Sequence, residues 1–246
     1  MVLLEVTTMS HPTHILDPDG EVIIVLRNAN SPFAQVSEDS IPAEKVLEVN
    51  APEEEVPEEE VPEADIPVEA PSDIRIQVSA KHMMFSSSYF KKSLTGLWKE
   101  SISYQQKGSV EITADGWDSN ALLIVFRAIH CQYNQIPKKI TLEMLAKVAA
   151  IADYYDCKDI LYVMTDRWID SLAEKIETAC SRDLMLWIWV SWYFHLPARF
   201  KESTSVAMAG SCVLIDGLGL PIPNTVIGKI TQIETSHWPY LIILQN

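Results

Sequence analysis

One stretch of the sequence, residues 117–157, restricts the fold more than any other, because it predicts two buried helices joined by a tight turn. Asp118 and Ser119 are typical N-cap residues, since a short side-chain oxygen accepts hydrogen bonds from the N–H groups at a helix start. The residues that follow are apolar on nearly every side, and such a helix is buried all round. Pro137 ends it, and Thr141 can cap a second helix with apolar residues at helical spacing. The sequence therefore predicts a helical hairpin in the middle of a domain.

Three short strands are expected before this hairpin. Residues 22–26 are five consecutive β-formers, which suits a buried strand. Residues 74–78 and 110–113 alternate apolar with polar side chains, as half-buried strands do. Between them, residues 79–94 are expected to form one short helix, and residues 101–108 a polar loop.

Helices dominate the chain after the hairpin. Four are expected, at residues 160–172, 182–196, 199–209 and 223–233. Strands that come early and helices that come late predict an α+β fold, in which a small mixed β-sheet is covered by a helical cluster. The last helices form a C-terminal helical extension over residues 161–233, and the tail at 234–246 fits no periodicity.

An acidic segment, residues 38–72, separates the first two strands. Between Glu38 and Asp73, 14 Asp and Glu stand against one Lys, which accounts for −13 of the net charge of −15. Prolines recur every fifth residue, so the segment is expected to be an extended, disordered insert. It is interpreted as a tolerated surface-loop insertion, with an acidic bait for a basic partner as the alternative. The remaining residues are nearly neutral, so no nucleic acid partner is expected.

The cysteines and the apolar runs bear on location. The chain has four cysteines, namely Cys131, Cys157, Cys180 and Cys212, without close pairing, so they are expected to be buried free thiols of a reducing compartment. The first ten residues lack the features of a signal peptide. The uncharged run at residues 184–196 is shorter than the ~20 residues of a membrane helix. A cytoplasmic or nuclear protein without membrane contact is expected.

Several residue groups resemble reactive sites but favour structural roles. His11 and His14 have HxxH spacing without a third ligand, so no metal is expected. His130 and Cys131 are neighbours on a helix, where adjacent side chains point about 100° apart and do not face each other. These two residues are interpreted as core residues.

Two further groups lead to the same interpretation. Asp153 and Asp156 are interpreted as surface and capping groups at the end of a helix. The tryptophans of the aromatic helix, namely Trp187, Trp189 and Trp192, are expected to pack against other helices. No catalytic, cofactor-binding or metal-binding set results. The alternative from another class is a small-molecule enzyme or sensor that uses a pocket at residues 184–196.

The ordered set of segments resembles the BTB/POZ domain, in particular the group of fungal BTB proteins. The resemblance lies at residues 17–34, 74–94, 109–130 and 141–157, and continues after the core at 182–194 and 219–230. It implies a leader at residues 1–15, a BTB/POZ-like domain formed by 16–37 and 73–160, the insert at 38–72, and the extension and tail. It further implies a non-enzymatic module that binds other proteins.

The resemblance also indicates a binding element. BTB proteins that act as adaptors for a cullin ubiquitin ligase use a short apolar-x-Glu element after the first core helix, and Trp98, Lys99 and Glu100 occupy that position. Alternatively, Trp98 covers the domain edge, or the chain is a nuclear co-regulator scaffold. Ser79 stands where many BTB domains have a histidine. Because no extra helix is found before the first strand, where dimeric members have much of their interface, a homodimer remains an open alternative but is not expected to form by the usual route.

Overall fold

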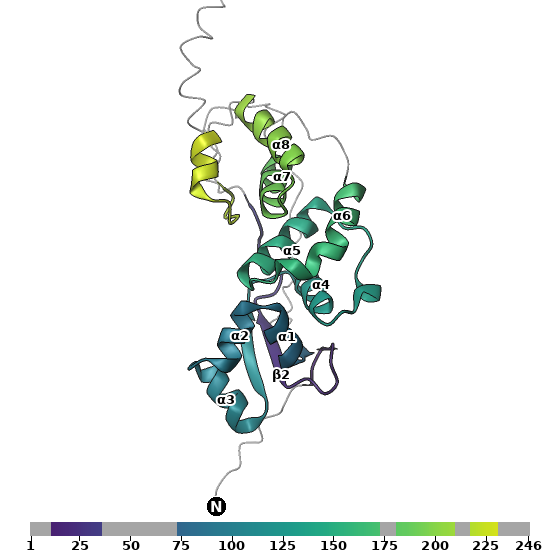
Figure 1. Ribbon diagram of the computed structural model, residues 1–246, viewed down its shortest axis with the longest axis vertical. Helices are drawn as coiled ribbons and strands as arrows, with labels where there is room; N and C mark the ends of the chain where they lie inside the picture. The colour runs from purple at the N-terminus through teal and green to yellow at the C-terminus, as the bar shows by residue number, and fades with distance from the viewer. Residues whose placement is uncertain (1–10, 36–72, 173–180, 210–216, 231–246) are drawn as a thin grey trace, which may run out of the picture.

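A small mixed sheet and a larger set of helices form the part of the chain that the computed structural model describes, residues 11–35, 73–172, 181–209 and 217–230. The sheet lies at one end with the first helices, the helical hairpin lies in the middle, and the last helices lie at the other end (Figure 1). The predicted α+β class is confirmed. The insert at 38–72, the tail at 234–246 and the first ten residues of the leader lie outside the described residues.

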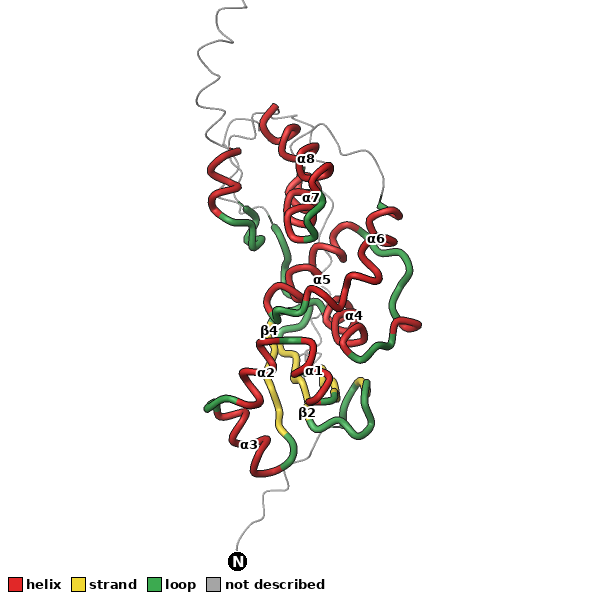
Figure 2. Tube along the Cα trace, viewed as in Figure 1, coloured by secondary structure: helices red, strands yellow, loops and turns green. Residues whose placement is uncertain are grey.

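The sheet has the strand order β1-β3-β2-β4, with β1 at His14–Ile15, β2 at Val22–Arg27, β3 at Ile74–Val78 and β4 at Val110–Asp115. β2 is antiparallel to β3 and parallel to β4, and β1 is parallel to β3. The three predicted strands are confirmed (Figure 2). β1 was not predicted, because two residues are too few for an alternation of side chains to be visible.

The inner face of the sheet is part of the core. Alternate residues of the three longer strands are buried there, namely Val22, Ile24, Leu26, Ile76, Val78, Val110, Ile112 and Ala114. The outer face carries half-buried Ile23 and Arg75 and exposed Glu111 and Thr113, and only Val25 of β2 is buried on that face. This alternation is the pattern expected of strands with one face on the core.

The first helical region differs from the prediction in two ways. The single helix expected at residues 79–94 is wrong, because α1 (Ala80–Ser86) and α2 (Ser88–Thr95) are separated at Ser87, whose backbone is extended with φ −138°. The Ser87 side chain accepts a hydrogen bond from the Phe90 N–H at 3.1 Å and caps α2. The polar loop expected at residues 101–108 is also wrong. Helix α3 (Lys99–Lys107) lies there and ends at Gly108, which has the left-handed φ of 71°.

The predicted hairpin is confirmed as α4 (Ser119–Ile129) and α5 (Leu142–Tyr154). The Asp118 carboxylate accepts hydrogen bonds from the Asn120 and Ala121 N–H groups, both at 3.0 Å. The Thr141 hydroxyl accepts from the Met144 N–H at 3.2 Å. Apart from its N-cap turn and Arg127, α4 is buried on all sides. Short 3-10 helices follow each helix, at Tyr133–Gln135 and Lys158–Leu161.

The expected later helices are present with shifted bounds, as α6 (Tyr162–Ser171), α7 (Arg182–Tyr193) and α8 (Pro197–Ala209). Residues 224–230 are helical as well. Helix α7 packs against both α5 and α8, and the Trp189 indole N–H donates to the Ala146 carbonyl at 3.2 Å. Among the described residues, none of the helices has the length and apolarity that crossing a bilayer requires.

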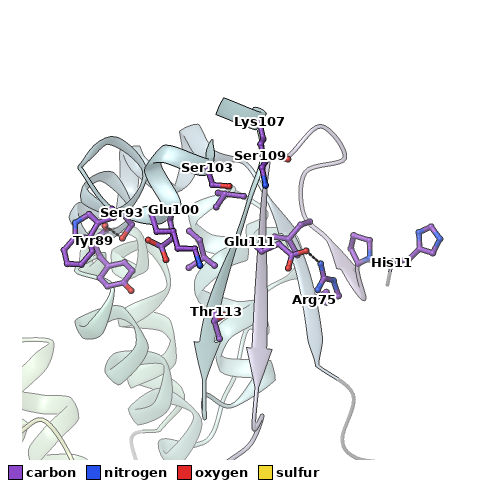
Figure 3. A pocket seen from close by; sticks show the side chains of 16 residues that line it. His11, Arg75, Tyr89, Ser93, Glu100, Ser103, Lys107, Ser109, Glu111 and Thr113 are labelled. Atoms are coloured by element: carbon purple, nitrogen blue, oxygen red, sulfur yellow. Dashed lines mark hydrogen bonds and ion pairs between the residues drawn. The ribbon is translucent and has the colours of Figure 1, made fainter. Parts of the chain in front are cut away.

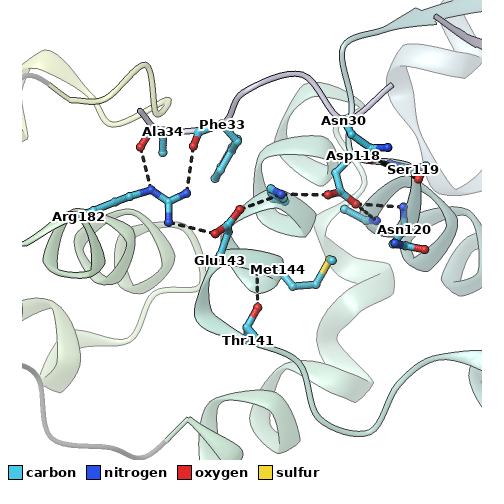
Figure 4. Close-up of polar contacts among 12 residues, drawn as sticks. Asn30, Phe33, Ala34, Asp118, Ser119, Asn120, Thr141, Glu143, Met144 and Arg182 are labelled. Carbon is cyan, nitrogen blue, oxygen red and sulfur yellow. Dashed lines mark hydrogen bonds and ion pairs between the residues drawn. The ribbon is translucent and has the colours of Figure 1, made fainter. Parts of the chain in front are cut away.

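A chain of polar contacts joins α7 to the rest of the fold (Figure 4). The Arg182 guanidinium donates to the carbonyl oxygens of residues 33 and 34, at 3.0 and 2.9 Å, and to the Glu143 carboxylate at 3.0 Å. Glu143 also pairs with Lys147 at 2.8 Å, and Lys147 with Asp118 at 2.9 Å. Hydrogen bonds from Lys147 and Arg182 hold the pKa of Glu143 below its usual value. Arg182 thus connects the start of α7 to α5 and to the chain segment after β2.

We expect Arg182→Ala to lower the free energy of unfolding by about 1–3 kcal/mol, because two backbone carbonyls and a carboxylate lose their donor. Urea unfolding measures the change, and amide hydrogen exchange should rise first in α7. Arg27→Ala is the matched control. Arg27 forms an exposed ion pair with Asp73 at 3.6 Å, so its loss should cost less than about 1 kcal/mol. Equal effects of the two variants would contradict this role of Arg182.

Candidate partner-binding site

The predicted binding element lies at the junction of α2 and α3. Trp98 is the N-cap residue of α3, and its side chain is 64% exposed, next to Leu97, which is 97% exposed. Gly96 makes this turn sterically feasible, since a Cβ there would lie 2.6 Å from the Lys92 carbonyl oxygen and 3.0 Å from the Trp98 ring. The backbone therefore presents two large apolar side chains to solvent. Trp98 does not fill the domain edge as a core residue would.

Two hollows flank Trp98. The larger, of about 970 Å³, lies between α3 and β4, and Lys99 and Glu100 also line it. The smaller, of about 340 Å³, lies beside Tyr89, Tyr154 and Asp156. The Tyr89 and Tyr154 rings are 5.4 Å apart. Trp98 therefore stands between two concave surfaces, one bordered by a sheet edge and one by tyrosines.

The polar groups of this site include one tyrosine with a shifted pKa and two charged side chains. Burial raises the pKa of Tyr89 to about 12, with contributions from the Tyr154 hydroxyl and the Glu100 carboxylate, so Tyr89 stays neutral at physiological pH. Neither Lys99 nor Glu100 forms an ion pair with a described residue. An exposed aromatic anchor beside available charges is typical of protein interfaces, where aromatic side chains contribute most affinity and charges set register.

His130 and Cys131 lie in different environments. The His130 ring is buried, where Nε2 accepts the Ser79 N–H at 2.9 Å and Nδ1 lies 2.8 Å from the Phe126 carbonyl oxygen. These two contacts place the proton on Nδ1. Burial lowers the pKa of His130, and neighbouring His82, whose ring stacks at 5.1 Å, lowers it further. His130 is a structural residue that ties α4 to the start of α1.

The expectation of buried thiols is wrong for Cys131. Its side chain is exposed, because the chain leaves α4 there with a left-handed φ of 56°. Cys157 is buried as expected, and burial raises the pKa of its thiol to about 12. Cys180 and Cys212 lie outside the described residues.

The remaining candidates are dispersed over the fold. Asp153 and Asp156 are exposed at the end of α5, where Asp156 accepts a hydrogen bond from the Ser88 hydroxyl. Trp187 and Trp189 are buried, whereas Trp192 is 40% exposed with its ring 5.6 Å from that of Phe200. None of the four principal hollows in the described residues is lined by these tryptophans.

The two N-terminal histidines, His11 and His14, lie at different places in the fold. His11 lines the larger hollow beside Trp98, while His14 belongs to β1. The described ranges contain no cluster of three or more His, Cys, Asp or Glu side chains that could hold a metal ion. Sequence reasoning missed Tyr89, Tyr154 and the edge of β4, since only the folded chain brings these elements next to Trp98.

No protein-family model matches this chain, and no curated protein sequence matches it either.

The buried His130 predicts a pH dependence of stability. Because its pKa in the folded chain lies below the ordinary value of 6.5, the unfolded chain takes up the proton first as the pH falls. This contribution is complete above about pH 6.5 and is lost below it, by up to about 1.4 kcal/mol per pH unit. His130→Gln should flatten this part of the profile in urea unfolding between pH 7 and pH 5. His195→Asn, at an exposed position, should leave the slope unchanged.

Proposed function

We propose that this chain is a protein-interaction module of the BTB/POZ type, without catalytic activity of its own, that acts as an adaptor for a cullin ubiquitin ligase. The order of elements supports the class. Strands β2 and β3, helices α1 and α2, strand β4 and the α4–α5 hairpin follow one another in the order of the segments that resemble this family. The insert also falls between β2 and β3, where the resemblance allows a surface loop.

The observation that carries the adaptor role is the exposure of Trp98 at the start of α3. Its indole is 64% exposed and Leu97 is 97% exposed, although the chain has a large core that could have buried them. Glu100 follows in the first turn of α3, where a carboxylate is favoured by the helix dipole. Trp98, Lys99 and Glu100 therefore form an apolar-x-Glu element at the start of helix α3.

The energetics of such an element suit partner binding. A large aromatic side chain that becomes desolvated in an interface can contribute 2 kcal/mol or more, as interface hot spots do. Glu100 would set the register of the partner by pairing with a cationic side chain. Trp98 is exposed and Glu100 is half-buried, so both side chains are accessible to a partner.

We expect Trp98→Ala combined with Glu100→Ala to abolish co-purification of the cullin. The free energy of unfolding should change by less than ~0.5 kcal/mol, as for surface substitutions. Quantitative pull-down and thermal unfolding measure the two effects. The matched control is Tyr162→Ala with Asp166→Ala, which removes an exposed aromatic and a carboxylate from α6. This control should retain cullin as the unmodified chain does.

Two results would reject the proposal. Equal cullin recovery by the double variant would remove the role of Trp98 and Glu100. A crosslinking survey without any protein partner, together with a reproducible turnover activity, would reject the interaction module as a class.

A further inference from the structure

The outer edge of β4 carries unpaired backbone groups. β4 is the last strand of the order β1-β3-β2-β4, and the N–H groups of Val110 and Gly116 donate toward the β2 side of the sheet, at 3.0 and 2.9 Å. In a parallel ladder, alternate residues direct their backbone groups to the same neighbour. Glu111 and Thr113 therefore direct their N–H and C=O groups away from β2. No described residue forms a hydrogen bond to these four groups.

A groove runs along this edge. It encloses about 970 Å³, and its lining comes from β4, from the outer face of the sheet and from α2 and α3. Figure 3 shows Tyr89, Ser93 and Glu100 on the helical side of the edge, and Ser103 and Lys107 near the start of β4. The edge groups of Glu111 and Thr113 thus border this hollow, with the helical side of the lining opposite them. Such an edge is a ready template for pairing with another chain.

The charges in the groove favour an acidic occupant. Arg75 and Glu111 are paired with each other on the outer face of the sheet (Figure 3). Lys99 and Lys107, both exposed, form no ion pair with a described residue, and they stand against the single carboxylate of Glu100. The unneutralised charge along the α3 wall is therefore positive.

We propose that an extended acidic segment of a partner protein binds in this groove and adds to β4 as a further strand. The backbone groups of Glu111 and Thr113 bind its main chain, Lys99 and Lys107 pair with its carboxylates, and Trp98 covers an apolar side chain. Main-chain hydrogen bonds supply affinity and alternate side chains supply specificity in this mode of recognition. The inference deepens the proposed function by naming the chemistry of a partner at the same site, and it rests on that function.

The test measures binding of labelled octapeptides to the full chain by fluorescence anisotropy. The probe alternates glutamate with valine, and the comparison peptide has lysine in place of glutamate. We expect the acidic peptide to bind at least tenfold more tightly than the lysine peptide. N-methylation of every second backbone nitrogen of the acidic peptide should abolish binding when the methylated nitrogens are those that face β4. Thr113→Pro removes one edge N–H without breaking the β2 ladder, a substitution that edge strands tolerate. It should weaken binding at least tenfold, whereas Thr113→Val should not.

Charge reversal gives an independent readout. Lys99→Glu with Lys107→Glu should transfer the preference to the lysine peptide. Equal binding of both peptides to the unsubstituted protein would overturn the proposal, and so would unchanged binding of the N-methylated acidic peptide. The N-methylated peptide needs no protein variant, so this test remains valid even if Thr113→Pro fails to fold. Self-association of the chain that Thr113→Pro abolishes would assign the edge to a second copy and would also overturn it. The adaptor role is tested by cullin recovery with the Trp98 and Glu100 double variant, whereas this inference is tested by peptide binding with Thr113 and lysine variants. Loss of peptide preference with intact cullin recovery would therefore reject this inference alone.

Discussion

The structure depends on the burial of helix α4 from all sides. Eight of its eleven residues are buried apolar side chains, so no face is left for water, and neighbours have to cover each one. Helix α5 and the short helix after it cover part of this surface, and α1 and the turn after α4 cover another part. Asp118 fixes where the helix begins, and His130 at its end holds the Ser79 N–H before α1. Helix α1, helix α5 and both 3-10 helices are thus arranged around one buried helix, which also contacts α2 through Phe90 and Phe126, whose ring centroids are 6.2 Å apart.

The sequence predicted best the elements whose signals are local and strong. The strand at Val22–Arg27 and the hairpin caps at Asp118 and Thr141 depend on adjacent residues, and the structure agrees with them. Helix α3 was missed because only Ser101 is buried in it, so no apolar period is present to detect. The break at Ser87 was missed for a related reason. Met83 and Phe90 keep a helical spacing across it, while the new helix start is marked by the Ser87 hydroxyl, which accepts a hydrogen bond from the Phe90 N–H.

At the candidate site too, the sequence predicted the residue with a local signal but not the residues that surround it. Exposure of Trp98 is consistent with its position in a short polar stretch, and the resemblance to adaptors indicated the residue directly. Its surroundings could not be predicted, since Tyr89, Tyr154 and Thr113 come from α2, α5 and β4. Their approach depends on tertiary packing, such as the 4.8 Å stack of Phe90 on Tyr155, which holds α2 against the end of α5. Patterns along one segment carry no information about such distances.

The placement of α3 has a consequence for the sheet. A free edge strand can cause aggregation, because any exposed strand of another chain can pair with it. Natural sheets limit such pairing by charged side chains, by β-bulges or by elements that cover the edge. Here α3 stands beside β4, and Lys99 and Lys107 line the hollow between them; in the proposal of an added strand, these two lysines select an acidic segment. The opposite edge is partly closed, since β1 pairs with β3 at residues 14 and 15. On this proposal, helix α3, which the sequence presents as a loop, converts an unspecific edge into a selective groove, although only one of its residues is buried.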